Sequence, residues 1–284
     1  MSLDVLVTGA TGFTGRRVVR ALVAAGHRVA AFVRETSDPE VVEALAVPAV
    51  TGDLGAPETL LKALRGREVL VNVASLGLGH APGIVRAAKE AGIARSVFLS
   101  TTAVRTALPS PTKAVRLEAE RTVLEGGVGA TLLRPTMIYG APGDRNLERL
   151  VRFVRRWPVV PIPGDGKGLQ QPVHVEDVAA SVARALPRAD LTGQAFDVPG
   201  PAPLSFEDLL RTVARVLGKK RWFPHVPRAL ARMVASKEQV ARLAEDKSCD
   251  PRPAGEAFGH APRPFEQGIR EEAAALGFLP AGAA

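Results

Sequence analysis

The chain has 284 residues, of which 46% are hydrophobic, and it carries a net charge of +8 with a pI of about 10.2. These values are typical of an ordinary soluble globular protein with one large domain or two closely joined ones, and the positive charge favours an anionic partner such as a nucleotide, a nucleic acid or a membrane surface. A single cysteine, Cys249, excludes an intramolecular disulfide and the thiolate clusters of structural zinc sites.

The hydropathy of the chain and its first residues indicate where in the cell the protein is expected. No apolar run approaches the roughly 20 residues that a membrane-spanning helix needs. The chain starts on a strand-like segment instead of a charged and then apolar leader. We therefore expect a cytoplasmic protein, for which peripheral association with a membrane or a protein complex stays open.

Short apolar segments alternate with amphipathic ones through the first half of the chain. The expected strands cover residues 3–8, 28–33, 46–50, 68–73, 96–100 and 130–133. The expected helices between them cover residues 13–25, 57–64, 83–91 and 112–124. This unbroken β-α-β-α order indicates an α/β fold in which a doubly wound parallel sheet carries helices on both faces.

The pattern changes after Tyr139, where a turn-forming cluster at 140–144 is followed by proline-rich segments and shorter elements. We expect a dinucleotide-binding Rossmann domain over residues 1–142 and a smaller, less regular substrate domain over residues 143–284. Within the second half, a helix at 175–186 and a strand at 194–198 are expected to return to the first domain.

The first strand breaks into a glycine turn that opens a helix, which is the local architecture for binding a dinucleotide pyrophosphate. Gly9 permits the tight turn, Gly12 lets the backbone approach the phosphates, and Gly15 lets the helix pack against the strand. The helix N-terminus offers unpaired N–H groups to the anion. The cofactor-binding residues expected here are Gly9, Thr11, Gly12, Phe13, Thr14, Gly15 and Arg16.

The second strand ends in Val33-Arg34, where a protein that binds NAD would place an acidic residue on the ribose 2′-hydroxyl. Val33 accepts no hydrogen bond, whereas the planar guanidinium of Arg34 suits a phosphate. Arg16 could approach the same phosphate. The sequence therefore favours NADP over NAD, the alternative being that Arg34 is a solvated surface residue.

Two further strand ends carry candidate cofactor contacts. Asp53 follows the third strand and could hydrogen-bond adenine while Leu54 covers the ring, or it could cap the next helix. The residues after the fourth strand lie where ligands collect outside the carboxyl ends of parallel strands. They are Asn72, Val73, Ala74 and Ser75.

Taken together, residues 8–15, 52–54, 72–75, 100–102, 133–140 and 172–178 resemble the short-chain dehydrogenase/reductase superfamily. The last two segments resemble its extended branch, which includes NAD-dependent epimerases and dehydratases, and the atypical members of the kind found as an accessory subunit of respiratory complex I. The resemblance implies that Ser100 and Pro135 also lie beside the cofactor.

The resemblance implies a catalytic serine or threonine after the fifth strand, then a tyrosine and, four residues later, a lysine on a helix. Thr102 matches the first role, but Thr112 stands at the tyrosine position and Arg116 at the lysine position. Arg116 can hold a ribose, yet its guanidinium cannot shuttle protons near neutral pH. Lys113 projects from nearly the same helix face and is the substitute acid to consider.

Two interpretations follow. The chain is an NADP-dependent oxidoreductase or sugar-nucleotide epimerase-like enzyme, or it is a non-catalytic protein that binds NADP for a regulatory, redox-sensing or complex-associated role. Tyr139 is the only tyrosine, and its position favours packing over proton transfer.

Basic clusters are the remaining signals. Arg145, Arg149, Arg152 and Arg156 form a helical stripe that is either a solvated face or the lining for an anionic substrate. The segment 219–222 adds Trp222 to three basic residues and could touch lipid or nucleic acid, although no sequence-specific nucleic-acid module accompanies it. The five histidines are scattered, with His174 expected to order the turn before the helix that begins near Glu176, so no metal site is expected.

Overall fold

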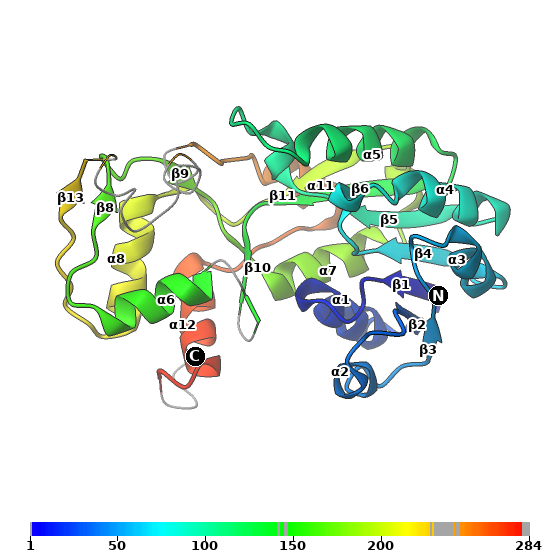
Figure 1. Cartoon of the computed structure of the whole chain (residues 1–284), viewed down its shortest axis with the longest axis horizontal. Helices are drawn as coiled ribbons and strands as arrows, with labels where there is room; N and C mark the ends of the chain where they lie inside the picture. Colours follow the sequence, from blue (N-terminus) through cyan, green and yellow to red (C-terminus); the bar gives the residue numbers. More distant parts are fainter. Residues whose placement is uncertain are drawn as a thin grey trace.

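The computed structural model describes residues 2–140, 143–144, 147–227, 229, 241 and 245–279. Its largest element is a seven-stranded sheet in which all neighbours are parallel (Figure 1). The strands are β1 (Asp4–Thr8), β2 (Arg28–Val33), β3 (Ala49–Thr51), β4 (Val69–Asn72), β5 (Arg95–Leu99), β6 (Ala130–Pro135) and β11 (Ala195–Val198). Their order, β11-β6-β5-β4-β1-β2-β3, reverses between β1 and β4, which confirms the doubly wound α/β class.

Helices cover both faces of this sheet. One face carries α1 (Phe13–Ala24), α7 (Val175–Ala185) and α11 (Arg252–Phe258), and the other carries α3 (Pro57–Leu64), α4 (Ala81–Glu90) and α5 (Lys113–Glu125). The twofold period of a strand places Val5 and Val7 in the first of these hydrophobic clusters and Leu6 in the second. All three are fully buried, as central strands of a parallel sheet require.

Two differences from the expected elements lie after β2. The helix α2 (Pro39–Glu43) was not expected, although its signal is in the sequence: the Asp38 carboxylate accepts a hydrogen bond from the Glu40 N–H at 3.0 Å and Pro39 opens the helix. The third strand begins at Ala49 rather than at residue 46. Ala46 has a φ of 53° and Pro48 has no N–H for the ladder, so neither can extend the strand.

Three further helices, at the left of Figure 1, surround a third hydrophobic cluster. The helices are α6 (Leu147–Arg156), α8 (Phe206–Val216) and α12 (Phe265–Ala275). The short strands pair as β7 (Ile138–Tyr139) with β10 (Val173–His174), β9 (Leu169–Gln170) with β12 (Leu204–Ser205), and β8 (Ile162–Pro163) with β13 (His225–Val226). Three short 3-10 helices are η1 (Leu76–Leu78), η2 (Thr102–Arg105) and η3 (Ala189–Leu191). In the described part of the chain, every helix is too short or too polar to cross a membrane.

Candidate functional site

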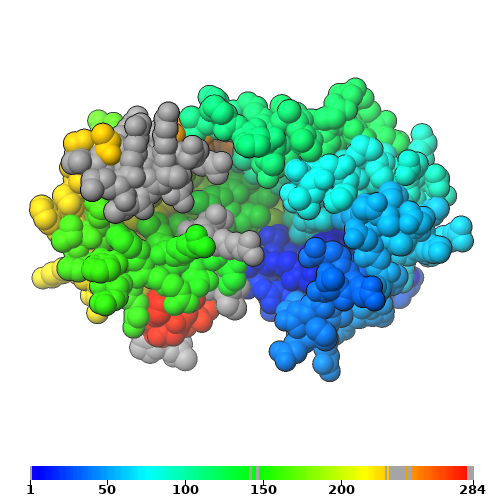
Figure 2. Space-filling view, viewed as in Figure 1, coloured from blue at the N-terminus to red at the C-terminus, as the bar shows by residue number. Residues whose placement is uncertain are grey.

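A cleft of about 1790 Å³ lies between the carboxyl ends of the sheet strands and the third hydrophobic cluster. The surface is hollowed between these two parts of the molecule (Figure 2). Residues after β1, β5 and β6 line one side, and residues of α6 and α8 line the other. The carboxyl ends of parallel strands at a topological switch point are where doubly wound proteins bind ligands.

The glycine turn after β1 lies at one end of this cleft and has no room for side chains. Gly9 has a φ of 68°, and a Cβ there would lie 2.7 Å from the Ala74 nitrogen. A Cβ on Gly15 would lie 2.0 Å from the Gly9 carbonyl oxygen. The turn therefore packs directly on the loop after β4, and α1 packs directly on the turn.

The N-terminus of α1 opens onto the cleft with its donors available. Its N-cap residue, Gly12, supplies no side-chain acceptor, and the first turn holds no acidic residue. Thr11, Gly12, Phe13, Thr14 and Arg16 all line the cleft. The buried Nε of Arg16 has no hydrogen-bond partner in the described residues. Free N–H groups, a helix dipole and an unpartnered guanidinium nitrogen make this end of the cleft fit a pyrophosphate.

Arg34 and Arg16 lie in different surroundings. Arg34 follows β2 in a tight turn, in which its N–H donates to the Ser37 hydroxyl at 3.1 Å and its carbonyl accepts from the Ser37 N–H at 2.9 Å. The Arg34 side chain is exposed and has no acidic partner in the ranges described. Arg16 lines the cleft, and its guanidinium lies 3.5 Å from where a Gly143 Cβ would stand. Arg34 does not line this cleft, so the expectation that both arginines approach one phosphate stays a prediction.

Asp53 and Leu54 follow β3 as expected, and the structure gives the aspartate a local role. One carboxylate oxygen of Asp53 accepts from the Gly55 N–H at 2.7 Å, which turns the chain toward α3. Leu54 packs against the second sheet-face cluster. Asp53 therefore orders the turn before α3 without capping the helix, whose N-cap is Ala56 and has no side-chain cap.

The residues after β4 divide into buried supports and exposed backbone. Asn72 is fully buried, and its amide accepts from the Thr8 hydroxyl at 2.7 Å and donates to the Ala74 carbonyl at 3.0 Å. The Val73 N–H donates to Thr8, and the Ser75 hydroxyl caps η1 through the Gly77 N–H. Asn72 thus holds the loop against β1 and has no amide group turned to a ligand.

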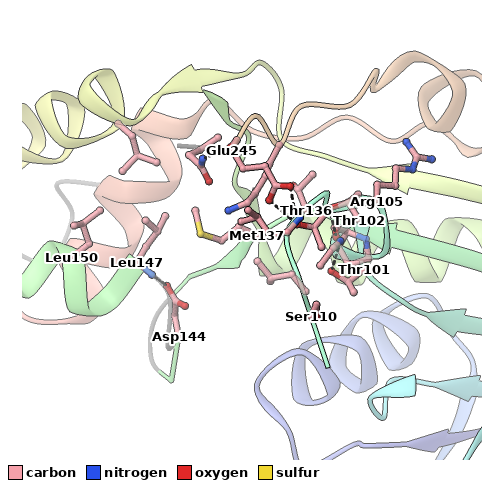
Figure 3. A pocket seen from close by; sticks show the side chains of 18 of the residues that line it. Thr101, Thr102, Arg105, Ser110, Thr136, Met137, Asp144, Leu147, Leu150 and Glu245 are labelled. Atoms are coloured by element: carbon pink, nitrogen blue, oxygen red, sulfur yellow. Dashed lines mark hydrogen bonds between the residues drawn. The ribbon is translucent and has the colours of Figure 1, made fainter. Parts of the chain in front are cut away.

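The hydroxyl groups expected near the reaction follow the end of β5 and lie close together. Thr102 and Ser100 line the cleft beside Pro135, and the Thr102 hydroxyl lies 3.4 Å from the Pro135 carbonyl oxygen. Ser100 donates instead to the buried carboxylate of Glu120. Figure 3 shows Thr101, Thr102 and Arg105 on the side of the pocket opposite Leu147 and Leu150 of α6.

Glu120 belongs to a buried ion pair that the sequence reasoning missed. Its carboxylate accepts three hydrogen bonds from the Arg134 guanidinium of β6, the shortest at 2.6 Å. Hydrogen bonding to Glu120 raises the pKa of Arg134. The pair fixes α5 to the sheet. The sequence shows only that Glu120 lies on the same helix face as Arg116, four residues earlier.

The structure separates the three polar residues at the start of α5. Thr112 and Arg116 line the cleft, and the Arg116 Nε would lie 3.0 Å from a Cβ on Gly77, so the guanidinium crosses the loop after β4. Lys113 does not line the cleft, and its ammonium donates to the Thr106 carbonyl at 2.6 Å. This placement argues against Lys113 as a substitute acid, because the helix turns its side chain toward the 106–108 loop.

Tyr139 is packed away from the cleft. It is 1% exposed, its ring meets the rings of His174 and Phe265 edge to face, and its hydroxyl lies 2.0 Å from where a Cβ on Gly268 would stand. Burial raises the pKa of the Tyr139 hydroxyl.

His174 is the N-cap of α7, and its ring nitrogen accepts a hydrogen bond from the Glu176 N–H at 3.3 Å. Burial lowers the pKa of His174 to about 4.

The far side of the cleft carries many apolar side chains, which were not expected from the sequence. Side chains from α6, α8 and the strands between them converge there from distant parts of the chain. They include Met137, Leu147, Leu150, Phe153, Phe206 and Leu209. Of the predicted arginine stripe, Arg149 lines the cleft, whereas Arg152 pairs with Glu148 at 2.9 Å and Arg145 lies outside the described residues.

The chain segment 245–249 closes one end of the cleft. The Glu245 carboxylate accepts from the Thr106 hydroxyl at 2.7 Å and from the Ala107 N–H at 2.8 Å, which joins this segment to the loop after β5. Burial raises the pKa of the Cys249 thiol to about 11, so it is protonated near neutral pH. Across the described residues, no cluster of three metal-ligating side chains occurs.

Comparison with known proteins identifies the family. Residues 9–188 match the family described as NAD(P)H-binding. The chain is 34% identical over 230 residues to a ceramide reductase of Caulobacter vibrioides, an alignment that covers 76% of this chain and 71% of the relative. It is 27% identical to subunit 9 of the NADH dehydrogenase [ubiquinone] 1 alpha subcomplex of Arabidopsis thaliana, over 81% of this chain and 62% of that protein.

A solved structure gives the same fold. A dTDP-glucose 4,6-dehydratase of Bacillus anthracis, in complex with NAD, superposes with a TM-score of 0.78 over 97% of each chain at 18% identity. The chain therefore belongs to the NAD(P)H-binding family within the extended short-chain dehydrogenase/reductase superfamily, and it is a nicotinamide-dinucleotide-binding protein.

Proposed function

We propose that this protein binds NADP(H) in preference to NAD(H) and holds, in the same cleft, a hydride acceptor with an extended apolar body. The glycine turn and the open N-terminus of α1 would hold the pyrophosphate, and Arg34 would pair with the 2′-phosphate. Ser75, Ser100, Arg116 and Pro135 would line the nicotinamide half, while Asp53 and Leu54 would meet the adenine. The exposed side chain of Arg34, which forms no ion pair in the described residues, supports the choice of NADP.

The apolar far wall carries the proposal for the acceptor. The leucine, phenylalanine and methionine side chains of this wall gain free energy by burying alkyl or aryl groups. The polar residues of the cleft, such as Arg149 and Gln170, would meet the polar end of such an acceptor. The ceramide reductase relative, by its name, acts on a substrate with long alkyl chains. We therefore place lipid-like compounds before sugar nucleotides as candidate acceptors.

The proton relay of ordinary carbonyl reductases is replaced in this proposal. The single observation that carries it is the burial of the chain's only tyrosine, Tyr139, outside the cleft. NADPH, when bound, supplies a hydride; Thr102 would orient an acceptor oxygen and Arg116 would hold the ribose, but neither releases a proton near pH 7. Carbonyl reduction is then slow unless the proton comes from solvent.

A second candidate is a non-catalytic NADP-binding subunit. It rests on the same missing relay and on the similarity to the NADH dehydrogenase subunit. Single-turnover oxidation of bound NADPH with long-chain ketones and with quinones separates the two candidates. Turnover that exceeds the buffer rate supports the enzyme, whereas tight NADPH binding without turnover over the whole panel supports the subunit.

The cofactor assignment is tested by Arg34→Asp. We expect NADPH affinity, measured by calorimetry, to fall about 10- to 100-fold with little change in NADH affinity, because a charge-assisted pair becomes a repulsion. Arg65→Asp is the matched control, since Arg65 is also exposed and follows α3 on the same sheet half. An equal loss for both cofactors would contradict the phosphate assignment.

The domain division at residue 142 and the cytoplasmic location belong to this proposal as well. The pairing of β11 with β6 and the third hydrophobic cluster support a Rossmann unit completed by residues 175–198 and a separate acceptor-binding unit. A fragment ending at residue 142 would lack α7 and β11, so we expect it to bind NADPH poorly.

A further inference from the structure

Both tryptophans of the chain are exposed on one corner of the molecule. Trp157 is 51% exposed and Trp222 is 67% exposed, and the chain has no others. Val159 beside them is 42% exposed, and Pro158 is exposed too. We call Trp157, Pro158, Val159 and Trp222 the tryptophan patch.

The patch is held in place by backbone pairing. The Trp222 N–H donates to the Pro158 carbonyl at 3.0 Å, and the Val160 N–H donates to the Trp222 carbonyl at 2.8 Å. Val159 and Trp222 form a parallel bridge, so their side chains project to the same side. The neighbouring Val160 and Phe223 point the other way, into the third hydrophobic cluster.

The guanidinium of Arg221 fixes the same corner to α6. It donates to the Val154 carbonyl at 2.7 Å and to the Arg155 carbonyl at 2.8 Å, the last carbonyls of the helix. Arg221 is therefore a structural cation at a helix C-terminus and is not available to a partner. The patch is therefore exposed on a part of the surface that hydrogen bonds hold in place.

Four other cations surround the patch: Arg155, Arg156, Lys219 and Lys220. All four are exposed, and none has an acidic partner within the described ranges. The Arg156 guanidinium lies 5.4 Å from the Trp157 ring centre and Arg155 lies over the Phe278 ring. The sequence carries no Asp or Glu between residues 149 and 164 or between 209 and 237.

Large exposed aromatic side chains beside four basic side chains without ion pairs match the interfacial region of a membrane. Tryptophan places its ring at the headgroup level, and unpaired lysines and arginines are attracted by anionic lipids. A second copy of the chain fits poorly, because a twofold contact would bring the basic rims together. We propose that the tryptophan patch and its basic rim bind the surface of an anionic phospholipid membrane.

The patch is continuous with the apolar wall of the cleft. Phe153 lines the cleft and lies one helical turn before Trp157, whose N–H donates to the Phe153 carbonyl at 3.0 Å. A docked molecule would therefore present this wall near the lipid surface. That consequence rests on the proposed function, whereas the docking itself does not.

Co-sedimentation of the full chain with vesicles tests the docking. We expect binding to vesicles of phosphatidylcholine with one-quarter phosphatidylglycerol, weak binding to pure phosphatidylcholine, and release at high salt. Lys219→Glu with Lys220→Glu should weaken binding at least about 10-fold. Lys62→Glu with Lys89→Glu makes the same charge change on exposed lysines of α3 and α4 and should change it little.

Intrinsic fluorescence gives a second readout, since all tryptophan emission comes from the patch. On binding we expect a blue shift and quenching by brominated lipids, with the Trp157→Phe variant reporting on Trp222 alone. Unchanged NADPH affinity and circular dichroism show that the variants are folded. The proposal is overturned if both charge variants bind vesicles equally or if the fluorescence does not change. It is also overturned if the patch mediates dimerisation, or if the chain prefers an oligonucleotide to vesicles.

Discussion

The two sides of the cleft are built in different ways. The cofactor side consists of backbone in close contact, where Gly9 and Gly15 leave no space for a Cβ and Asn72 ties two strand ends together. The acceptor side consists of apolar side chains on α6 and α8, far from one another in sequence. The first side has no room for a larger residue at its glycines, whereas a side chain of the second can be changed without a backbone clash, so the two sides can be tested separately.

The largest expected effect is on the support of the cofactor side. Glu120→Ala leaves the half-buried guanidinium of Arg134 without its carboxylate and should lower the free energy of unfolding by about 3 kcal/mol, measured by urea denaturation. Glu118→Ala on the same helix removes an exposed ion pair with Arg121 and should cost less than about 1 kcal/mol. Similar losses for the two variants would mean that the buried pair does not hold α5.

Gly9→Ala should nearly abolish cofactor binding, with NADPH affinity reduced at least about 100-fold, because both φ and the contact with Ala74 exclude a methyl group. Calorimetry measures the loss. Gly26→Ala is the control, since Gly26 has a φ of 84° but open space around its Cβ, so it reports the backbone strain alone. If the two variants bind NADPH equally, steric exclusion at the turn is unimportant.

On the acceptor side, Glu272 gives the stability a pH dependence. Burial, with Asp144 and Glu148 nearby, raises its pKa from about 4.5 to about 8. The folded state therefore keeps a proton that the unfolded state has lost, so this stabilisation is complete below about pH 4.5 and disappears as the pH rises to about 8.

Glu272→Gln should remove that dependence. We expect the free energy of unfolding of the unmodified chain to fall by about 1–2 kcal/mol between pH 6.5 and 8 relative to the variant, from urea melts at each pH. Glu266→Gln, on the same helix but paired on the surface with Arg215, is the control. Parallel pH profiles for the chain and Glu272→Gln would contradict the raised pKa.

The smallest expected effect comes from a substitution in the apolar wall, and it should affect one side of the cleft without the other. Phe153→Ala removes one apolar contact from the acceptor wall and should raise the dissociation constant of a long-chain ligand about 10-fold, with NADPH affinity unchanged. Leu117→Ala, at an exposed position of α5, should change neither. Fluorescent fatty-acid displacement measures the first quantity, and a fall in NADPH affinity would show that the sides are coupled.

The fold and the family were predictable because their signals are local. A strand, a glycine turn and a helix follow one another over residues 4–24, and the β-α alternation needs only short-range periodicity. The role of Asn72 was not predictable, because its amide is taken up by Thr8, 64 residues away. The contact of Lys113 with the Thr106 carbonyl was not predictable either, because helical spacing gives a face and not the direction in which a long side chain turns.

By itself, the sequence determined the doubly wound sheet, the glycine turn after the first strand and the presence of a single tyrosine. Only the tertiary structure decided that Tyr139 is buried outside the cleft, that an apolar wall faces the cofactor side, and that Trp157 lies beside Trp222. The physical reason is distance along the chain: backbone conformation and periodicity act over a few residues, whereas a wall or a patch exists only after remote segments have packed together.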